Sequence, residues 1–198
     1  MKPVAIEAAD ARVQRARGTI SIMERSDVPI RDIESAWWTF LLAASGVYSK
    51  LEQGAKGAGK SEAWFGRVKH TRKNDPLLSY LHHARNSEEH SLETTASAGV
   101  ASIESRHPSV RVSGLTDDPP SIDIDIHSAL ESDEPIGTIT IGVCIRPVKD
   151  DRFGDTFPIP KTHLGKPLSS RDVSYIAKLG LAHLEHLVVE ARSLSSQD

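Results

Sequence analysis

Apolar residues recur at helical spacing in the first half of the chain. One stripe advances in steps of three and four residues and consists of Ile33, Trp37, Leu41, Ala44, Tyr48 and Leu51. This period is typical of an amphipathic helix with one buried face. The sequence therefore predicts a helix that is capped by Ser26 or Asp27, has Pro29 in its first turn and runs to about residue 53.

Three further helices or helix-like segments are expected around this one. The first covers about residues 6–25, and a short helix covers about residues 61–71. Asp75 and Pro76 suit the N-cap and the first helical position, so they predict a helix that reaches about residue 93. Gly54 is a stop signal, and the glycine- and lysine-rich residues 54–60 predict a mobile loop.

The second half of the chain alternates between apolar and polar residues, which is the pattern of half-buried strands. One strand is predicted over residues 122–126 and another over residues 139–145, and the segment between them is a candidate hairpin connection. Weaker signals mark strands at residues 100–105 and 110–113. Together they predict a small antiparallel sheet, followed by an extended, proline-rich segment.

A last helix follows an approximate capping box of Ser169 and Asp172. Its stripe suits close helix packing, either on the helical half or at a dimer seam, and consists of Val173, Ala177, Gly180, Leu184, Leu187, Ala191 and Leu194. The predicted fold class is α+β. It comprises a helical region over residues 1–97, a β-rich region over residues 98–168 and a C-terminal helix over residues 169–198.

Composition places the chain among globular proteins with a real core. Of the 198 residues, 38% are hydrophobic and 26% are charged. No apolar run reaches the roughly 18 residues that a membrane-spanning helix needs, and the N-terminus lacks an apolar signal core, so we expect no membrane partner. Cys144 is the only cysteine and cannot form a disulfide within the chain, so a cytoplasmic location is the simplest expectation.

Charge is unevenly distributed, although the net charge is only −3. Residues 115–145 carry seven acids and no lysine or arginine. Residues 56–73 carry one acid, Glu62, and six basic residues, namely Lys56, Lys60, Arg67, Lys69, Arg72 and Lys73. Both stretches are either solvated surfaces or binding surfaces. A basic stretch of this kind would bind a polyanion, and Lys69, Arg72 and Lys73 are the candidate RNA-binding residues.

One motif stands above this background, within the helix that Asp75 begins. Arg85 is followed by Asn86 and, after three more residues, by His90. The chain has only two asparagines, which makes the position of Asn86 informative. The pattern resembles the signature of the HEPN superfamily, over roughly residues 1–95. The resemblance implies a compact helical bundle that often dimerises, and many members are metal-independent endoribonucleases in toxin, antiphage or RNA-processing systems. The strand-rich region is not part of this pattern.

The resemblance implies that Arg85, Asn86 and His90 are catalytic and that two protomers bring their sets together. The residue types suit that chemistry. RNA cleavage without a metal needs a group that moves protons at the 2′-hydroxyl or the leaving 5′-oxygen, and a histidine suits either step. An arginine holds the phosphate as negative charge builds. We therefore expect no metal and no cofactor, RNA as a partner and a homodimer.

Helix geometry offers a structural alternative for the same residues. On an ideal helix, positions five apart point about 140° away from each other, so Arg85 and His90 converge only if the helix ends, widens or kinks, or across a dimer. In the alternative, Arg85 pairs with Glu88 or Glu89 on a packed face, and His90 is solvated.

Other patterns define weaker candidates. Two sets of metal-ligating residues share a face, and solvent-facing polarity explains both as well: Asp123, Asp125 and His127, and His183, His186 and Glu190. Residues 54–61 match the Walker A pattern through Gly54, Gly59, Lys60 and Ser61, but a helix precedes them where a strand is needed. The alternatives to an RNA-cleaving or RNA-binding protein are thus an interaction module that uses the acidic β region, and a nucleotide-binding protein.

Overall fold

The structure of the chain is a computed structural model, and it describes residues 1–90, 94–105, 110–117, 120–126, 137–149 and 155–195. Within these residues the chain forms five helices and four two-stranded antiparallel sheets. The predicted α+β class is confirmed. No helix in the described part of the chain is long and apolar enough to cross a membrane.

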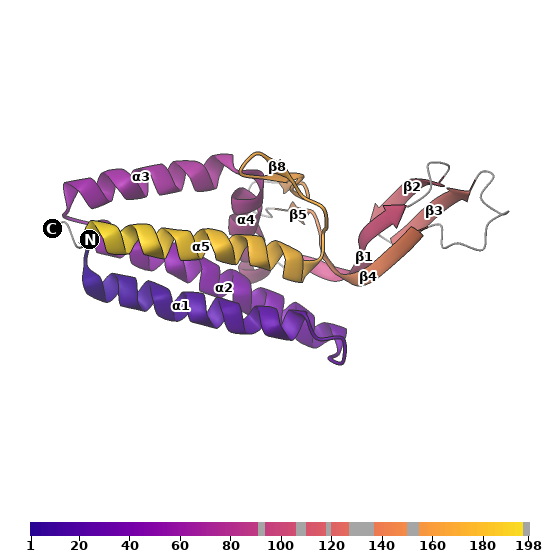
Figure 1. The fold of residues 1–198 in the computed structure, drawn as a ribbon, viewed down its shortest axis with the longest axis horizontal. Helices are drawn as coiled ribbons and strands as arrows, with labels where there is room; N and C mark the ends of the chain where they lie inside the picture. The colour runs from indigo at the N-terminus through magenta and orange to yellow at the C-terminus, as the bar shows by residue number, and fades with distance from the viewer. Residues whose placement is uncertain (91–93, 106–109, 118–119, 127–136, 150–154, 196–198) are drawn as a thin grey trace.

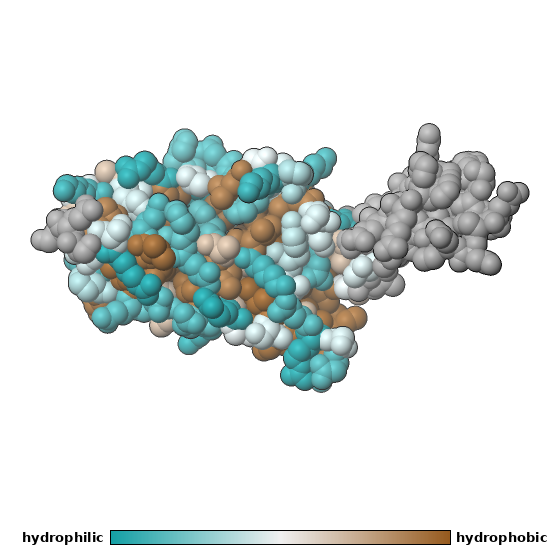
Figure 2. Space-filling view, in the orientation of Figure 1, coloured by the Kyte–Doolittle hydropathy of each residue, from teal (hydrophilic) through white to brown (hydrophobic). Residues whose placement is uncertain are grey.

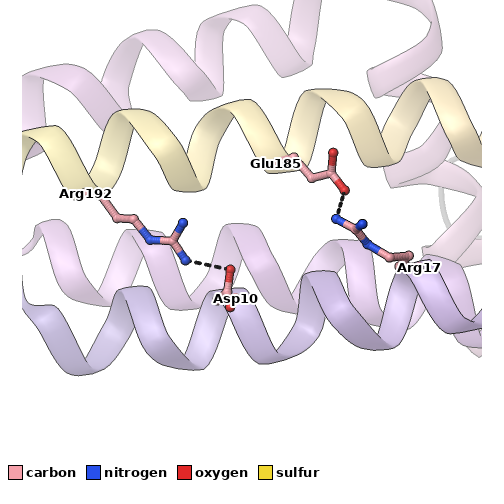
Figure 3. A network of polar contacts seen from close by, with 4 residues as sticks. All are labelled: Asp10, Arg17, Glu185 and Arg192. Atoms are coloured by element: carbon pink, nitrogen blue, oxygen red, sulfur yellow. Dashed lines mark hydrogen bonds and ion pairs between the residues drawn. The ribbon is translucent and has the colours of Figure 1, made fainter.

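The helices form one body. They are α1 (Pro3–Met23), α2 (Ile30–Ala55), α3 (Gly59–Asn74), α4 (Pro76–His90) and α5 (Val173–Ser195). Figure 1 shows α1, α2, α3 and α5 running alongside one another, with α4 running across them next to the end of α3. Two surface ion pairs join α5 to α1, one between Arg192 and Asp10 at 2.8 Å and one between Arg17 and Glu185 at 2.6 Å (Figure 3). Such exposed pairs contribute little to stability, so packing must hold α5 in place.

The predicted apolar stripe of α2 lies at the centre of the core. Trp37 and Leu41 are fully buried, and Phe40 stacks on Trp37 with ring centroids 5.8 Å apart. The stripe of α5 packs against this core and is buried up to Ala191. It therefore completes the helical body within one chain and does not form a dimer seam. Figure 2 shows the result: polar residues cover much of the visible helical face, with apolar patches among them.

A glycine allows α5 to approach its neighbours closely. A Cβ atom at Gly180 would lie 3.0 Å from Leu81 Cδ1 and 3.1 Å from Phe40 Cζ. Both distances are tighter than ordinary carbon–carbon contacts. The small residue that the sequence places in the α5 stripe thus lets α2, α4 and α5 meet.

The predicted helix starts are right in one case and wrong in two. Asp75 caps α4 as expected, because its Oδ1 accepts a hydrogen bond of 2.9 Å from the backbone N–H of Leu78. In α5 the cap is Asp172 rather than Ser169: Asp172 Oδ1 accepts a hydrogen bond of 2.8 Å from the N–H of Ser174. A carboxylate directly before the helix reaches its free N–H groups, whereas a residue three positions earlier does not.

The start of α2 also differs from the prediction. Pro29 is its N-cap, with no capping hydrogen bond from a side chain, so neither Ser26 nor Asp27 has that role. The Asp27 carboxylate instead pairs with Arg25, at 2.8 Å, which satisfies it outside the helix.

The predicted loop over residues 54–60 is wrong. α2 continues to Ala55 and α3 begins at Gly59, which leaves three residues between them. Gly54 is buried in α2, where the start of α1 lies against it: the N–H of Lys2 donates to the Gly54 carbonyl oxygen at 3.1 Å. A Cβ atom at Gly54 would overlap that of Ala5. Packing thus outweighs the weak helix propensity of glycine.

The predicted strands are present, but their pairing differs from the expected hairpin. β1 (Ala96–Ser105) pairs with β4 (Gly137–Ile145), and β2 (Val110–Asp117) pairs with β3 (Pro120–Ile126). The hairpin expected between the strands now called β3 and β4 is therefore wrong. An alternating pattern determines which face of a strand is buried, but it does not determine which other strand it pairs with. The expected connection, residues 127–136, lies outside the described residues.

The β1–β4 pair is attached to the helical body at one end, and β2 and β3 lie away from that body in Figure 1. The N–H of Ile145 donates to the Arg171 carbonyl oxygen at 2.9 Å. On β1, the register shifts at Ala101, whose carbonyl oxygen accepts hydrogen bonds from Ser170 Oγ at 2.9 Å and from the N–H of Arg171 at 3.2 Å. The bulge thus directs a ladder carbonyl to the segment before α5.

Two short pairs complete the fold within the described residues. β5 (Val148–Lys149) pairs with β6 (Thr156–Phe157), and β7 (Thr162–His163) pairs with β8 (Lys166–Pro167). The proline-rich segment is thus extended in part, as predicted, but it turns back at Leu164 and Gly165, both with positive φ.

Candidate functional site

The predicted motif lies in the last part of α4. Arg85 forms an ion pair with Glu89, one helical turn further on, and its side chain is 27% exposed. Arg85 Nη1 also donates a hydrogen bond of 3.3 Å to Asn86 Oδ1, while its Nε is buried without a partner. The structural alternative offered Glu88 or Glu89 as the partner, and the structure shows the pairing with Glu89 at i+4. Arg85 is therefore held by its own helix, and its buried Nε–H is left without an acceptor.

The side chain of His90 lies outside the described residues, so its convergence with Arg85 stays a prediction. Of the two acids between them, Glu88 has a structural role. Glu88 Oε1 accepts hydrogen bonds from the N–H of Thr95 at 2.8 Å and from Thr95 Oγ1 at 2.7 Å. Thr95 Oγ1 in turn accepts one from Trp37 Nε1 at 3.0 Å. This chain of bonds joins α4 to the start of β1 and to the core of α2.

The three predicted RNA-binding residues lie near the end of α3 and have different surroundings. Lys69 pairs with Glu52 at 3.2 Å, and Lys73 is exposed. Arg72 lies over the ring of Tyr48, with its guanidinium carbon 4.6 Å from the ring centroid. Arg72 makes no ion pair with a carboxylate within the described part of the chain. Its positive charge is therefore not neutralised by a direct contact there.

The fold places Arg72, from α3, with His82 in the lining of one pocket, and His82 precedes Arg85 by one turn of α4. Burial first, and then the neighbouring Arg72, His83 and Arg85, lower the pKa of His82 to about 4. His82 is thus a neutral ring at pH 7 in a region of positive potential. Sequence reasoning did not single out His82. Its spacing of three from Arg85 was the available signal, but the contribution of Arg72 depends on how α3 packs on α4.

A second polar cluster lies at the start of α4. Asp75 Oδ1 is 3.0 Å from His163 Nδ1, and Asp75 Oδ2 accepts a hydrogen bond of 2.6 Å from the N–H of Leu164. Leu164 has φ of 48°, a conformation that costs free energy for a leucine. The ring of His183, from α5, meets that of His163 edge-on at 6.2 Å between centroids. Asp75 thereby holds the turn between β7 and β8 against α4.

Two predicted alternatives find no support in the geometry. Within the described residues, no three histidines, cysteines or carboxylates are grouped as metal ligands. Glu190 of the predicted His183 set instead accepts a hydrogen bond of 3.0 Å from Trp64 Nε1. The side chains of Asp123, Asp125 and His127 lie outside the described residues. The Walker-like residues 54–61 belong largely to α2 and α3, with no preceding strand to form a phosphate-binding loop.

Acid should destabilise the fold through two histidines. Burial is the main cause that lowers the pKa of both His82 and His183 to about 4. The unfolded chain takes up these protons near pH 6.5, whereas the folded chain resists them. The stability that these two neutral histidines contribute is therefore fully present above about pH 6.5 and is lost as the pH falls through about 4.

The expected result is a melting temperature that falls from pH 7 to pH 4, with a smaller fall in the double variant His82→Gln, His183→Gln. His186→Gln, at an exposed position on α5, is the matched control. An equal fall in the double variant and the wild type would contradict the assignment.

In comparisons with protein-family models, with curated protein sequences and with solved structures, no match to this chain was found.

Proposed function

We propose that this chain is a HEPN-like RNA-binding protein of the cytoplasm that cleaves RNA without a metal, in a toxin or antiphage defence system. The observation that carries the proposal is that Arg72 lies with His82 in the lining of one pocket, and that His82 precedes Arg85 by one turn of α4. Arg85 belongs to the motif of α4, and Arg72 belongs to the basic segment of α3. Two residues that were singled out separately as phosphate ligands thus both contribute positive potential at His82. The helical body that surrounds them fits the bundle that the HEPN resemblance implies.

The proposed reaction assigns a role to each motif residue. The 2′-oxygen of a nucleotide attacks the adjacent phosphorus, and the bond to the 5′-oxygen breaks. His90 accepts the proton of the 2′-hydroxyl or gives one to the leaving 5′-oxygen. Arg85 holds the non-bridging oxygens, and Asn86 orients the arginine through the hydrogen bond from Arg85 Nη1. The phosphate has to compete with Glu89 for Arg85, because the two already form an ion pair.

The proposed active species is a homodimer, because the HEPN resemblance implies a composite site from two protomers. The stripe of α5 is buried within one chain, so another surface must join the protomers. A second proposal is an interaction module that uses the acidic β region. The position of β2 and β3, away from the helical body in Figure 1, favours that role and is compatible with RNA cleavage by α4.

The test is metal-independent cleavage of single-stranded RNA in the presence of EDTA. Arg85→Ala and His90→Ala should each reduce cleavage by about 100-fold or more, the usual range for an acid–base group or a charge-stabilising donor. Glu89→Gln should strengthen RNA binding, because it releases Arg85 from its ion pair. The matched controls are Arg15→Ala, exposed on α1, and His186→Ala, exposed on α5.

Melting temperature and light scattering on the same preparations complete the test. A fully active His90→Ala protein beside a destabilised Arg85→Ala protein would refute the nuclease proposal in favour of the structural role of Arg85. Full activity of a monomer would refute the composite site.

A further inference from the structure

A small pocket opens beside Arg72, where α2, α3, α4 and α5 meet. Its floor is apolar and includes Leu41, Leu81 and Leu184. Its polar groups are Ser45, Tyr48, Arg72 and His82. The cavity has a volume of about 20 Å³, which is room for roughly one water-sized group. A whole nucleotide does not fit inside it, but a single oxygen-bearing group can enter.

The buried donor in this pocket has no partner. Tyr48 is only 8% exposed, and its hydroxyl makes no hydrogen bond within the described residues. Leaving a buried hydroxyl unsatisfied costs about 1–3 kcal/mol, so an unpaired hydroxyl of this kind commonly marks a ligand or water position. Burial raises the pKa of Tyr48 above its ordinary value, so the hydroxyl stays protonated and is available as a donor.

The charge around the pocket favours an anion. Arg72 covers the Tyr48 ring and has no carboxylate partner in the described part of the chain. Arg85 adds positive potential at His82 from the same helix. The groups that α2 and α5 contribute, Ser45 and Gly180 among them, carry no charge. The Asp75 carboxylate acts on Tyr48 in the opposite sense to Arg72, so the positive potential lies on the Arg72 and His82 side of the pocket. On that side an anion is favoured and a cation is repelled.

We infer that Tyr48, Arg72 and His82 form a binding site for one phosphate group. One phosphate oxygen enters the pocket and accepts the hydrogen bond of the Tyr48 hydroxyl. The guanidinium of Arg72 binds the outer oxygens, since its planar fork matches a phosphate. The phosphate group comes either from the backbone of a bound RNA or from a free phosphate. The inference does not require that the α4 motif cleaves RNA.

The direct experiment is a titration with inorganic phosphate that is monitored through the imidazole signals of His82 in NMR spectra. A titration with chloride at equal ionic strength is the control. We expect saturable shifts of the His82 signals and a rise of its pKa, because the bound anion offsets the two arginines. Signals of His186, exposed on α5, should not move and serve as the internal control.

Variants separate the binding role from a structural one. Arg72→Gln should weaken phosphate binding about tenfold or more, as expected for a lost hydrogen bond to a charged group. Tyr48→Phe should weaken it about threefold to tenfold, while the melting temperature stays equal or rises because an unsatisfied hydroxyl is removed. The matched control is Arg67→Gln, an exposed arginine on α3 that donates to the Ala63 carbonyl oxygen.

Competition with a single-stranded RNA oligonucleotide identifies the source of the phosphate. Displacement of inorganic phosphate by RNA places the site on the path of the RNA backbone. Binding of phosphate that RNA does not displace assigns the site to a free phosphate, independently of the cleavage result. Unchanged His82 signals up to high millimolar phosphate, or undiminished binding by both Tyr48→Phe and Arg72→Gln, would overturn the inference.

Discussion

Replacing Trp37 with alanine is expected to lower the free energy of unfolding by about 3–5 kcal/mol, the range for large aromatic residues in a core. Trp37 is fully buried and stacks on Phe40 with an interplanar angle of 16°. Its Nε1 also donates to Thr95 Oγ1, at 3.0 Å, so the side chain both fills the core and fixes the segment after α4. The substitution removes both contributions.

Urea denaturation measures the loss of unfolding free energy, and two further variants separate the contribution of the ring from that of the hydrogen bond and of the position. Trp37→Phe keeps an aromatic ring but removes the Nε1 donor, so it should cost less than the alanine variant. Trp38→Ala removes the neighbouring tryptophan, which is only partly buried, and should cost clearly less than Trp37→Ala. Equal losses at the two tryptophans would contradict the placement of Trp37 at the centre of the core.

Replacing Asp75 with alanine is expected to have the second large effect and to lower the free energy of unfolding by about 2–4 kcal/mol. The cause is the loss of a helix cap and of hydrogen bonds to a charged group. Asp75 is buried and has three partners. It caps α4 through Leu78, contacts His163 Nδ1 and accepts the N–H of Leu164. The alanine variant leaves all three partners in place without their acceptor.

Asp75→Asn is the matched variant, because asparagine caps helices about as well as aspartate. Its amide oxygen can replace only one of the two carboxylate oxygens, so it should recover the cap and not the contacts to both His163 and Leu164. We expect the free energy of unfolding of Asp75→Asn to lie between that of the wild type and that of Asp75→Ala. A loss equal to that of Asp75→Ala would show that the cap contributes little.

The effect of Asp75 should depend on pH. Burial tends to raise the pKa of Asp75, but the hydrogen bonds from Leu164, His163 and Leu78 outweigh it and lower the pKa. A lowered pKa means that the contribution is present above the ordinary aspartate value of about 3.9 and is lost as the pH falls through the lower, folded value. The stability difference between the wild type and Asp75→Ala should therefore shrink in strong acid and stay constant near neutral pH.

Local signals in the sequence predicted the parts of the site that depend on one helix. The helical spacing of Arg85 from Glu88 and Glu89 predicted, as the structural alternative, an ion pair with one of them, and Asp75 before Pro76 predicted the start of α4. The polar clusters around Tyr48 and around Asp75 were not predicted, because their members are far apart in the chain. Tyr48 and Arg72 come from α2 and α3, and His163 reaches Asp75 from a turn 88 residues away. No spacing rule connects such residues.

The sequence by itself determined the helices, the four longer strands β1 to β4 and the α+β class of this protein. The reason is that hydrophobic period and capping residues act over a few positions, as the buried stripe of α2 and the cap at Asp75 illustrate. Only the tertiary structure decided the partners of the strands, the helical state of Gly54 and the place of α5 inside the bundle. Those outcomes depend on which surfaces fit together. The positive potential at His82 and the unpaired hydroxyl of Tyr48 arise in the same way, because four helices must pack before either exists.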